Sequence, residues 1–534
     1  TGLSIVIAAF TGGYLTSRLA GSAVRSGSAV RPGSVPLRAA ALLVVALCVL
    51  PLAVVVVEAV KAGPGRAAEV LWRPRLAELL VNSTALVALT VTLTTVLGVG
   101  AAWLVERTTL RGARFWRVAL VCPLAVPAFV NSYAWISVRP QLEGLSGAVL
   151  VTSLSYFPFV FLPVSAVLRG LDPGLEDTAR TLGLGPWRTF GRAVLPQLRP
   201  ALLGGMLLVA LHLLSEFGVL AMLRFPTFTT AILEQYQVAF NSTAGSLLAS
   251  VLIVLALGLL TVEMLLRGTA RHARVGRGSA RRQAPVPLGR TAPLALTGLG
   301  VLVALSLGVP ALSVGRWLLT GDTATDPALL ARTLWGTLRL GLVAALLATV
   351  AAFPIAWLVA RSRSWFAVTA ERATYVASSL PGVVVGLALV ALTVQYARPF
   401  YQTSLVLVLA YTILFLPRAM VAIRAAIAHA PPDLAETARS LGDGPLRTFV
   451  RVQLPLTMRG VLAGCSLVYI AVATELTATL LLAPTGTQTL ATAFWSLSES
   501  LDYAGAAPYA AAMVLLSAPL IYLLLHRGEE EQLP

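Results

Sequence analysis

The sequence predicts an all-α polytopic membrane protein built from two tandem six-helix repeats. Of the 534 residues, 57% are hydrophobic and only 12% are charged, and the mean hydropathy is +0.83. Soluble globular chains are roughly 45–50% apolar and about 25% charged, so the composition excludes a soluble enzyme as the main interpretation. Two further observations give the architecture: apolar runs of membrane-spanning length, and a motif that occurs once in each half of the chain.

Twelve apolar runs are long enough for helices that cross a bilayer, which need about 20 residues each. A shorter apolar run at 1–17 is a candidate for an additional spanning helix, an interfacial segment or a poorly ordered end. The twelve runs are 39–60, 82–105, 118–136, 147–168, 201–223, 245–266, 292–314, 338–360, 375–396, 404–428, 461–482 and 507–526.

Basic residues are concentrated in alternate connections between these runs. With the N-terminus of the first firm span in the cytoplasm, the inner segments hold 30 basic residues and the outer segments hold nine. Membrane proteins retain Lys and Arg on the cytoplasmic side, so this bias predicts the orientation. It also accounts for the net charge of +17 without a nucleic-acid partner, since the sequence has no basic domain interleaved with aromatic residues.

A stretch rich in Arg, Gly, Ser and Pro at 267–291 is typical of a flexible cytoplasmic linker. It separates a first repeat at 39–266 from a second repeat at 292–527. The N-terminal segment 1–38 combines the short apolar run with a basic cytoplasmic stretch, and 528–534 is an acidic tail. Because each repeat has an even number of spans, we expect a pseudo-twofold axis along the membrane normal.

Two loops repeat similar residues at an offset of 259 positions, Leu175–Gly183 and Leu434–Gly442. A proline near the start of each copy suits the first turn of a helix, and the closing glycine suits a left-handed cap. Each loop is therefore predicted to form a short helix, a glycine turn and a second helix beneath the membrane. The second helix is expected to stop near a Leu-Pro pair, at Pro196 or Pro455.

These loops resemble the EAA loop of permease subunits in binding-protein-dependent ABC importers. They depart from its pattern where Asp177 replaces Glu, where Thr178 and Thr437 replace the first Ala, and where Ala193 replaces a larger apolar residue. The residues that the resemblance assigns to ATPase coupling are Glu176, Asp177, Ala179, Gly183 and Pro196 in the first copy, and Glu436, Ala438, Gly442 and Pro455 in the second.

More specifically, the chain is similar to fused permeases of ferric-iron importers over roughly residues 40–526. Fused permeases for thiamine, and related ones for phosphonates and polyamines, share the architecture, so these substrates stay open. The segments that carry the similarity to ferric-iron permeases are Leu214–Gly218, Leu223–Ile232, Pro381–Gly386 and Thr474–Leu480.

The resemblance implies a type I importer in the bacterial cytoplasmic (inner) membrane that works by alternating access. Two copies of an ABC ATPase subunit would each hold one EAA helix and bind ATP and Mg²⁺, while an extracytoplasmic binding protein would deliver substrate. The chain itself is expected to bind no cofactor and to perform no catalysis. It cannot carry a P-loop, which needs Gly-Lys-Ser/Thr, because its only lysine, Lys61, lies between Val60 and Ala62.

Glu216 and its counterpart Glu475 are the most informative carboxylates within the apolar runs. Glu216 follows Pro200 by 16 residues, which places it about 24 Å along a helix, where charges are costly and usually face a cavity or a partner. We interpret the two as a paired acidic site that contacts a cation such as Fe³⁺ in the translocation pathway. His212, one helical turn earlier, is a further pathway candidate. A structural hydrogen bond or salt bridge at the outer gate is the alternative.

The outer segments 224–244 and 483–506 carry the aromatic residues Tyr236, Phe240, Trp495 and Tyr503. Anchoring at the membrane interface and contact with the binding protein are the two interpretations. Arginines of the inner loops are suited to contact anionic lipid or the ATPase subunits.

A proton-coupled secondary transporter also fits twelve spans, and a non-transporting scaffold fits the composition. Neither explains the duplicated loop, and paired intramembrane glutamates argue against a scaffold. The cysteines Cys48, Cys122 and Cys465 form no CxxC pattern, so no zinc or redox motif is predicted.

Overall fold

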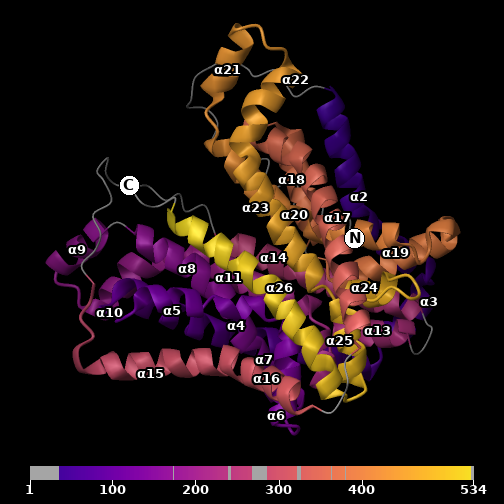
Figure 1. Ribbon diagram of the computed structural model, residues 1–534, viewed down its shortest axis with the longest axis horizontal. Helices are drawn as coiled ribbons and strands as arrows, with labels where there is room; N and C mark the ends of the chain where they lie inside the picture. The colour runs from indigo at the N-terminus through magenta and orange to yellow at the C-terminus, as the bar shows by residue number, and fades with distance from the viewer. Residues whose placement is uncertain are drawn as a thin grey trace. The chain divides into compact units, whose positions relative to one another are not determined.

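The computed structural model describes residues 35–171, 173–237, 242–267, 285–321, 326–362, 364–378 and 380–530. Throughout these ranges the regular structure is helical, and no strand is formed (Figure 1). The all-α expectation is therefore confirmed for this part of the chain. Residues 1–34, most of the linker 267–291 and residues 531–534 of the tail lie outside the described residues, so the interpretation of the run at 1–17 stays a prediction.

Most of the helices correspond to the apolar runs. Their bounds are α2 (Val35–Lys61), α3 (Gly63–Leu71), α4 (Pro74–Arg107), α5 (Ala113–Ala119), α6 (Ala128–Val138), α7 (Gly144–Tyr156), α8 (Pro158–Gly170), α9 (Pro173–Thr181), α10 (Pro186–Thr189), α11 (Leu195–Ser215), α12 (Gly218–Met222), α13 (Phe228–Gln237), α14 (Ser242–Arg267), α15 (Ala292–Val303), α16 (Val309–Thr320), α17 (Pro327–Arg361), α18 (Trp365–Ser378), α19 (Gly382–Tyr396), α20 (Ser404–His429), α21 (Pro432–Ser440), α22 (Pro445–Thr448), α23 (Leu454–Ala473), α24 (Thr477–Leu482), α25 (Leu490–Glu499) and α26 (Tyr503–Glu530).

Among the described residues, nine helices are long and apolar enough to cross a membrane, and a bent pair raises the number to ten. The bent pair joins Ala113–Ala125 to Ala128–Val138 at 91°, with Pro127 at the bend. The run 375–396 is also divided, because α18 ends at Ser378 and Pro381 precedes α19. Multiple membrane spans are thus found, and the count of twelve stays a prediction.

The chain forms two compact units that do not follow the sequence halves. One contains Ala344–Ser378 and Tyr411–Val468 together with the segment up to Leu50, and the other contains Pro51–Val343, Ser379–Ala410 and the remainder from Tyr469. The first unit therefore holds α21 and the second holds α9. Helices α2, α17, α20 and α23 each have residues in both units.

In the unit that holds α9, helices α4, α8 and α11 pack on one another. Glycines permit this close approach. A Cβ at Gly98 of α4 would lie 2.9 Å from Val160 Cβ, and a Cβ at Gly205 of α11 would lie 3.0 Å from the Phe159 carbonyl oxygen. In the other unit, a Cβ at Gly460 of α23 would meet Ala426 of α20. Small residues bring membrane helices together in this way.

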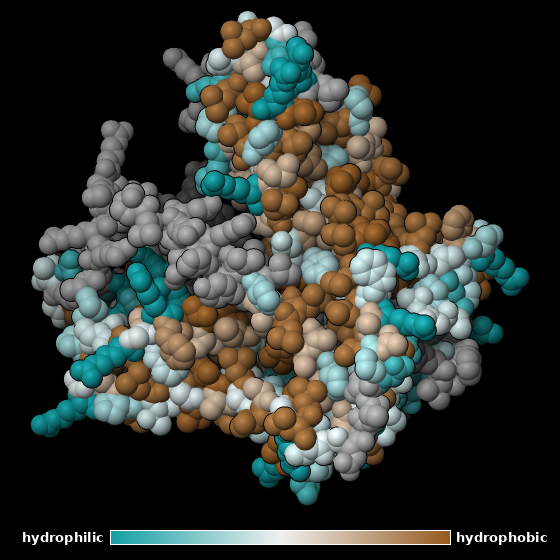
Figure 2. Space-filling model, viewed as in Figure 1, coloured by the Kyte–Doolittle hydropathy of each residue, from teal (hydrophilic) through white to brown (hydrophobic). Residues whose placement is uncertain are grey.

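Large apolar side chains are exposed along the long helices. Leu43, Val96, Leu312 and Val350 are 72%, 64%, 76% and 68% exposed, and Figure 2 shows broad hydrophobic surfaces over the helices on the viewed face. Large exposed apolar patches mark surfaces that contact another protein or a membrane. Contact with lipid accounts for them.

Candidate coupling loops and pathway residues

The first duplicated loop forms the predicted short helix, glycine turn and second helix. After α9, Gly183 has a φ of 81°, and the Leu184 N–H bonds the Ala179 carbonyl at 3.1 Å. Helix α10 then continues through a π-helical turn, Phe190–Val194, into α11. The left-handed backbone at Gly183 favours glycine because a Cβ is strained there.

The second loop repeats each of these features. Gly442 has a φ of 95°, and the Asp443 N–H bonds the Ala438 carbonyl at 3.0 Å. Helix α22 again leads through a π-helical turn, Phe449–Gln453, into α23. Such turns are rare and concentrate at functional sites. The helix ends expected near Pro196 and Pro455 are not found there. Each proline is instead the second residue of α11 or α23, because the π-helical turn joins the two helices.

The two loops expose equivalent side chains. Asp177 and Glu436 are exposed, whereas Ala179 and Ala438, two residues later, are each only 8% exposed. Each short helix thus turns its acidic residue outward and its alanine inward. This arrangement leaves the carboxylates free to meet a partner protein.

An aromatic contact joins each loop to a membrane helix. The ring centroids of Trp103 and Phe190 are 5.2 Å apart, and those of Trp357 and Phe449 are 5.8 Å apart. Trp103 lies near the end of α4 and Trp357 near the end of α17. The π-helical turn of each loop therefore packs on the last turns of a long membrane helix.

Glu176 differs from the other predicted coupling residues because it is 3% exposed and bonds Arg107 at 2.8 Å. It is held inside the protein rather than presented to a partner. Neighbouring Glu106, which sequence reasoning missed, accepts hydrogen bonds from Arg117 at 3.0 Å and from Ser165 at 2.5 Å. The available signal for Glu106 was a glutamate directly after the apolar run 82–105, next to an arginine.

Glu216 lies in the break between α11 and α12. Its Oε1 accepts the Val219 N–H at 3.2 Å, and its Oε2 accepts a hydrogen bond from the Tyr156 hydroxyl. The Thr229 hydroxyl donates to its carbonyl oxygen at 2.7 Å. The carboxylate therefore holds the first turn of α12, and the expected continuous run 201–223 is interrupted here.

Glu475 lies in the matching break between α23 and α24. Its Oε1 accepts the Ala478 N–H at 3.0 Å, and the Thr479 hydroxyl donates to its carbonyl oxygen at 2.7 Å. A Cβ at Gly382 would lie 3.0 Å from this Oε1, so the start of α19 approaches the carboxylate closely. The two glutamates thus have equivalent structural positions, and both are half-buried.

His212 lies beside Tyr156, which bonds Glu216. Its ring centroid is 5.8 Å from that of Tyr156 and 4.5 Å from that of Phe159, and its Nδ1 is 2.9 Å from the Leu208 carbonyl oxygen. Within the described ranges, no group of three or more His, Cys, Asp or Glu side chains could hold a metal ion. A cation contact at Glu216 and Glu475 stays a prediction.

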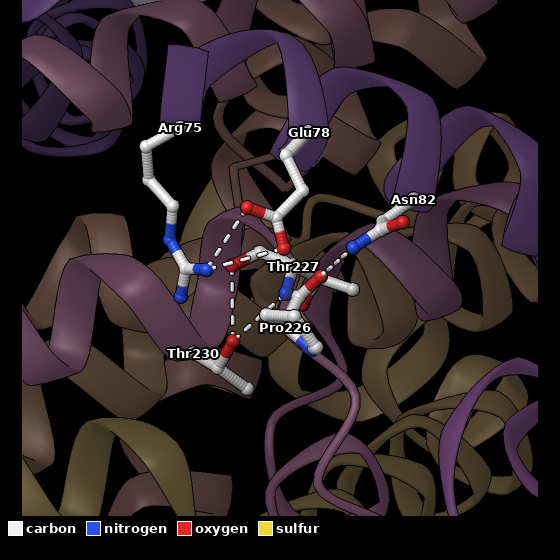
Figure 3. A network of polar contacts seen from close by, with 6 residues as sticks. All are labelled: Arg75, Glu78, Asn82, Pro226, Thr227 and Thr230. Atoms are coloured by element: carbon white, nitrogen blue, oxygen red, sulfur yellow. Dashed lines mark hydrogen bonds and ion pairs between the residues drawn. The ribbon is translucent and has the colours of Figure 1, made fainter. Parts of the chain in front are cut away.

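The segment before α13 is joined to α4 by a hydrogen bond (Figure 3). Asn82 donates to the Pro226 carbonyl at 3.0 Å, and the Thr227 N–H bonds the Thr230 hydroxyl at 2.9 Å. Arg75 and Glu78 form an exposed ion pair one turn earlier on α4.

Two of the aromatic residues considered as interfacial anchors or binding-protein contacts pack against other rings of the chain. Trp495 is 8% exposed, and its ring centroid lies 5.1 Å from that of Phe217. Tyr503 is half-buried, and its ring centroid lies 5.4 Å from that of Tyr133. Burial, together with Tyr401, raises the pKa of Tyr236 to about 12. Phe240 lies outside the described residues.

Comparison with known proteins gives the class. The family model described as "Binding-protein-dependent transport system inner membrane component" matches residues 95–265 and again 352–525. The chain therefore belongs to this family of transport permeases and contains its domain twice. It is a membrane transport subunit, not an enzyme, and works with a substrate-binding protein and separate ATPase subunits.

Individual relatives differ in how much of the chain they cover. A Fe(3+)-transport system permease protein of Haemophilus influenzae is 36% identical over 483 residues, which are 90% of this chain and 95% of the relative. A ferric transport system permease protein of Actinobacillus pleuropneumoniae is 22% identical over 86% of this chain and 72% of its own length. The molybdenum transport system permease protein of Escherichia coli is 27% identical over 40% of this chain and 97% of its own length.

Proposed function

We propose that the chain forms the membrane path of an ATP-driven ferric-iron importer. The observation that carries the proposal is the pair of equivalent coupling loops, present in one chain that resembles a ferric-iron permease over 90% of its length. One ATPase subunit at each loop gives two copies per permease. A pseudo-twofold axis along the membrane normal, twelve spans and a cytoplasmic start to α2 complete the proposed architecture.

The pathway part of the proposal rests on Glu216 and Glu475. Each carboxylate lies where a membrane helix breaks, and broken helices commonly border transport sites. Carboxylate oxygens suit a hard cation. The relatives named for molybdenum and sulfate transport match 40% and 35% of this chain. The acidic pair favours a cation over such anions.

Uptake of labelled Fe³⁺ tests the proposed substrate. We expect a strain that lacks the gene to lose Fe³⁺ uptake, and the restored gene to return it to the wild-type rate. A restored gene with a disabled ATPase partner should leave uptake at background, because the permease has no energy source of its own. Uptake of thiamine, phosphonate or a polyamine that depends on the gene, with Fe³⁺ uptake unchanged, would contradict the iron assignment and retain the permease class.

A further inference from the structure

The two coupling loops share a framework but differ at one buried position. Glu176 of α9 corresponds to Ala435 of α21, and both side chains are buried, at 3% and 5% exposed. Arg107, the last residue of α4, corresponds to Arg361, the last residue of α17. Both repeats therefore contain the arginine, but only the first contains a carboxylate that pairs with it.

In the first loop the pair is closed. Arg107 Nη2 donates to Glu176 Oε1 at 2.8 Å, and the two side chains are 7% and 3% exposed. A buried pair of this kind holds its two elements firmly, because separating them leaves an uncompensated charge away from water. Helix α9 is therefore fastened to the end of α4.

In the second loop the arginine has weaker contacts. Arg361 Nη2 lies 3.5 Å from the Ala430 carbonyl oxygen, and its guanidinium carbon lies 5.6 Å from the centroid of the Trp357 ring. Neither of these contacts reaches α21. The aromatic contact between Trp357 and Phe449 is present in the second loop, so the two loops differ only in the buried ion pair.

We infer that Glu176 is a positioning residue that makes the two coupling helices mechanically unequal: α9 moves together with α4, whereas α21 can shift relative to α17. The role of the loops in coupling rests on the proposed function. The unequal fastening itself does not, because it concerns contacts within this chain.

Hydrogen exchange of the purified full chain, without ATPase subunits, tests the fastening directly. We expect amides of α9 to exchange more slowly than those of α21. Because a charge-assisted hydrogen bond is lost, E176A should speed exchange in α9 by about tenfold or more, and A435E should slow exchange in α21 by pairing with Arg361. R75A, which breaks an exposed ion pair on the same helix α4, should leave α9 unchanged. Equal exchange rates in α9 and α21 of the wild-type chain would overturn the inference. So would unchanged exchange rates in both E176A and A435E.

Transport by the assembled complex then tests the positioning role. E176A should raise the number of ATP molecules hydrolysed per ion transported, while the ATPase subunits stay bound. Exchanging the charges in R107E/E176R should bring this ratio back toward the wild-type value, which a general loss of folding would not allow. An unchanged ratio in E176A contradicts the positioning role. Failure of the wild-type chain to bind an ATPase would instead contradict the proposed function and leave the exchange result standing.

Discussion

Replacing Glu216 and Glu475 together by glutamine is expected to abolish Fe³⁺ uptake while the permease still assembles. Glutamine keeps an oxygen that can accept the Val219 and Ala478 N–H groups. At Glu216 the new NH2 group can donate to the Tyr156 hydroxyl oxygen, which reverses the direction of that hydrogen bond. The substitution thus removes the negative charges while the side chains keep their size and shape. Because contacts to a charged partner contribute more than neutral ones, we expect the uptake rate to fall by about tenfold or more.

Uptake and membrane abundance measured together separate charge from structure. E78Q, which neutralises an exposed glutamate on α4, is the matched control and should transport normally. The E216A/E475A variant, which loses the hydrogen bonds as well, should lower the amount of assembled permease. Normal uptake by the double glutamine variant would contradict a pathway role and leave these residues a structural role at the helix breaks.

Reversing the charges of Asp177 and Glu436 with lysine is expected to detach the ATPase subunits. Both carboxylates are exposed at equivalent positions of α9 and α21, and charge reversal at an interface opposes binding as well as removing a favourable contact. Uptake should fall to background, and co-purification of ATPase should be lost in D177K/E436K.

The single variants D177K and E436K, and E69K on the surface helix α3, are the comparisons for that experiment. Each single variant should keep one ATPase contact and retain partial co-purification, whereas E69K should behave as wild type. Full co-purification by the double variant would contradict docking through these carboxylates.

Local features were predictable from the sequence because they depend on neighbouring residues. The helix, left-handed glycine and second helix of each loop follow from a proline at the start and Gly183 or Gly442 at the end. Burial of Glu176 was not predictable in this way, because its partner Arg107 lies 69 positions earlier. Hydropathy alone likewise gave no sign that the run 201–223 would break at Glu216, where a hydrogen bond from Tyr156 stabilises the break.

The pairing of aromatic residues was also beyond the sequence. Trp495 and Tyr503 are of the residue types that anchor proteins at membrane interfaces. Their ring partners, Phe217 and Tyr133, come from the first half of the chain. Contacts between distant segments decide whether such a side chain faces lipid, solvent or protein. The helix boundaries at Pro127 and Pro381, in contrast, could have been placed by the conformational limits of proline.

Transport by the reconstituted complex tests the central claim most directly. The full chain, its ATPase subunit and its binding protein are incorporated into lipid vesicles, and accumulation of labelled Fe³⁺ is followed with ATP or with a non-hydrolysable analogue. Our account predicts accumulation that requires the binding protein and ATP hydrolysis together. Accumulation at the same rate without hydrolysis, driven by a proton gradient alone, would contradict it.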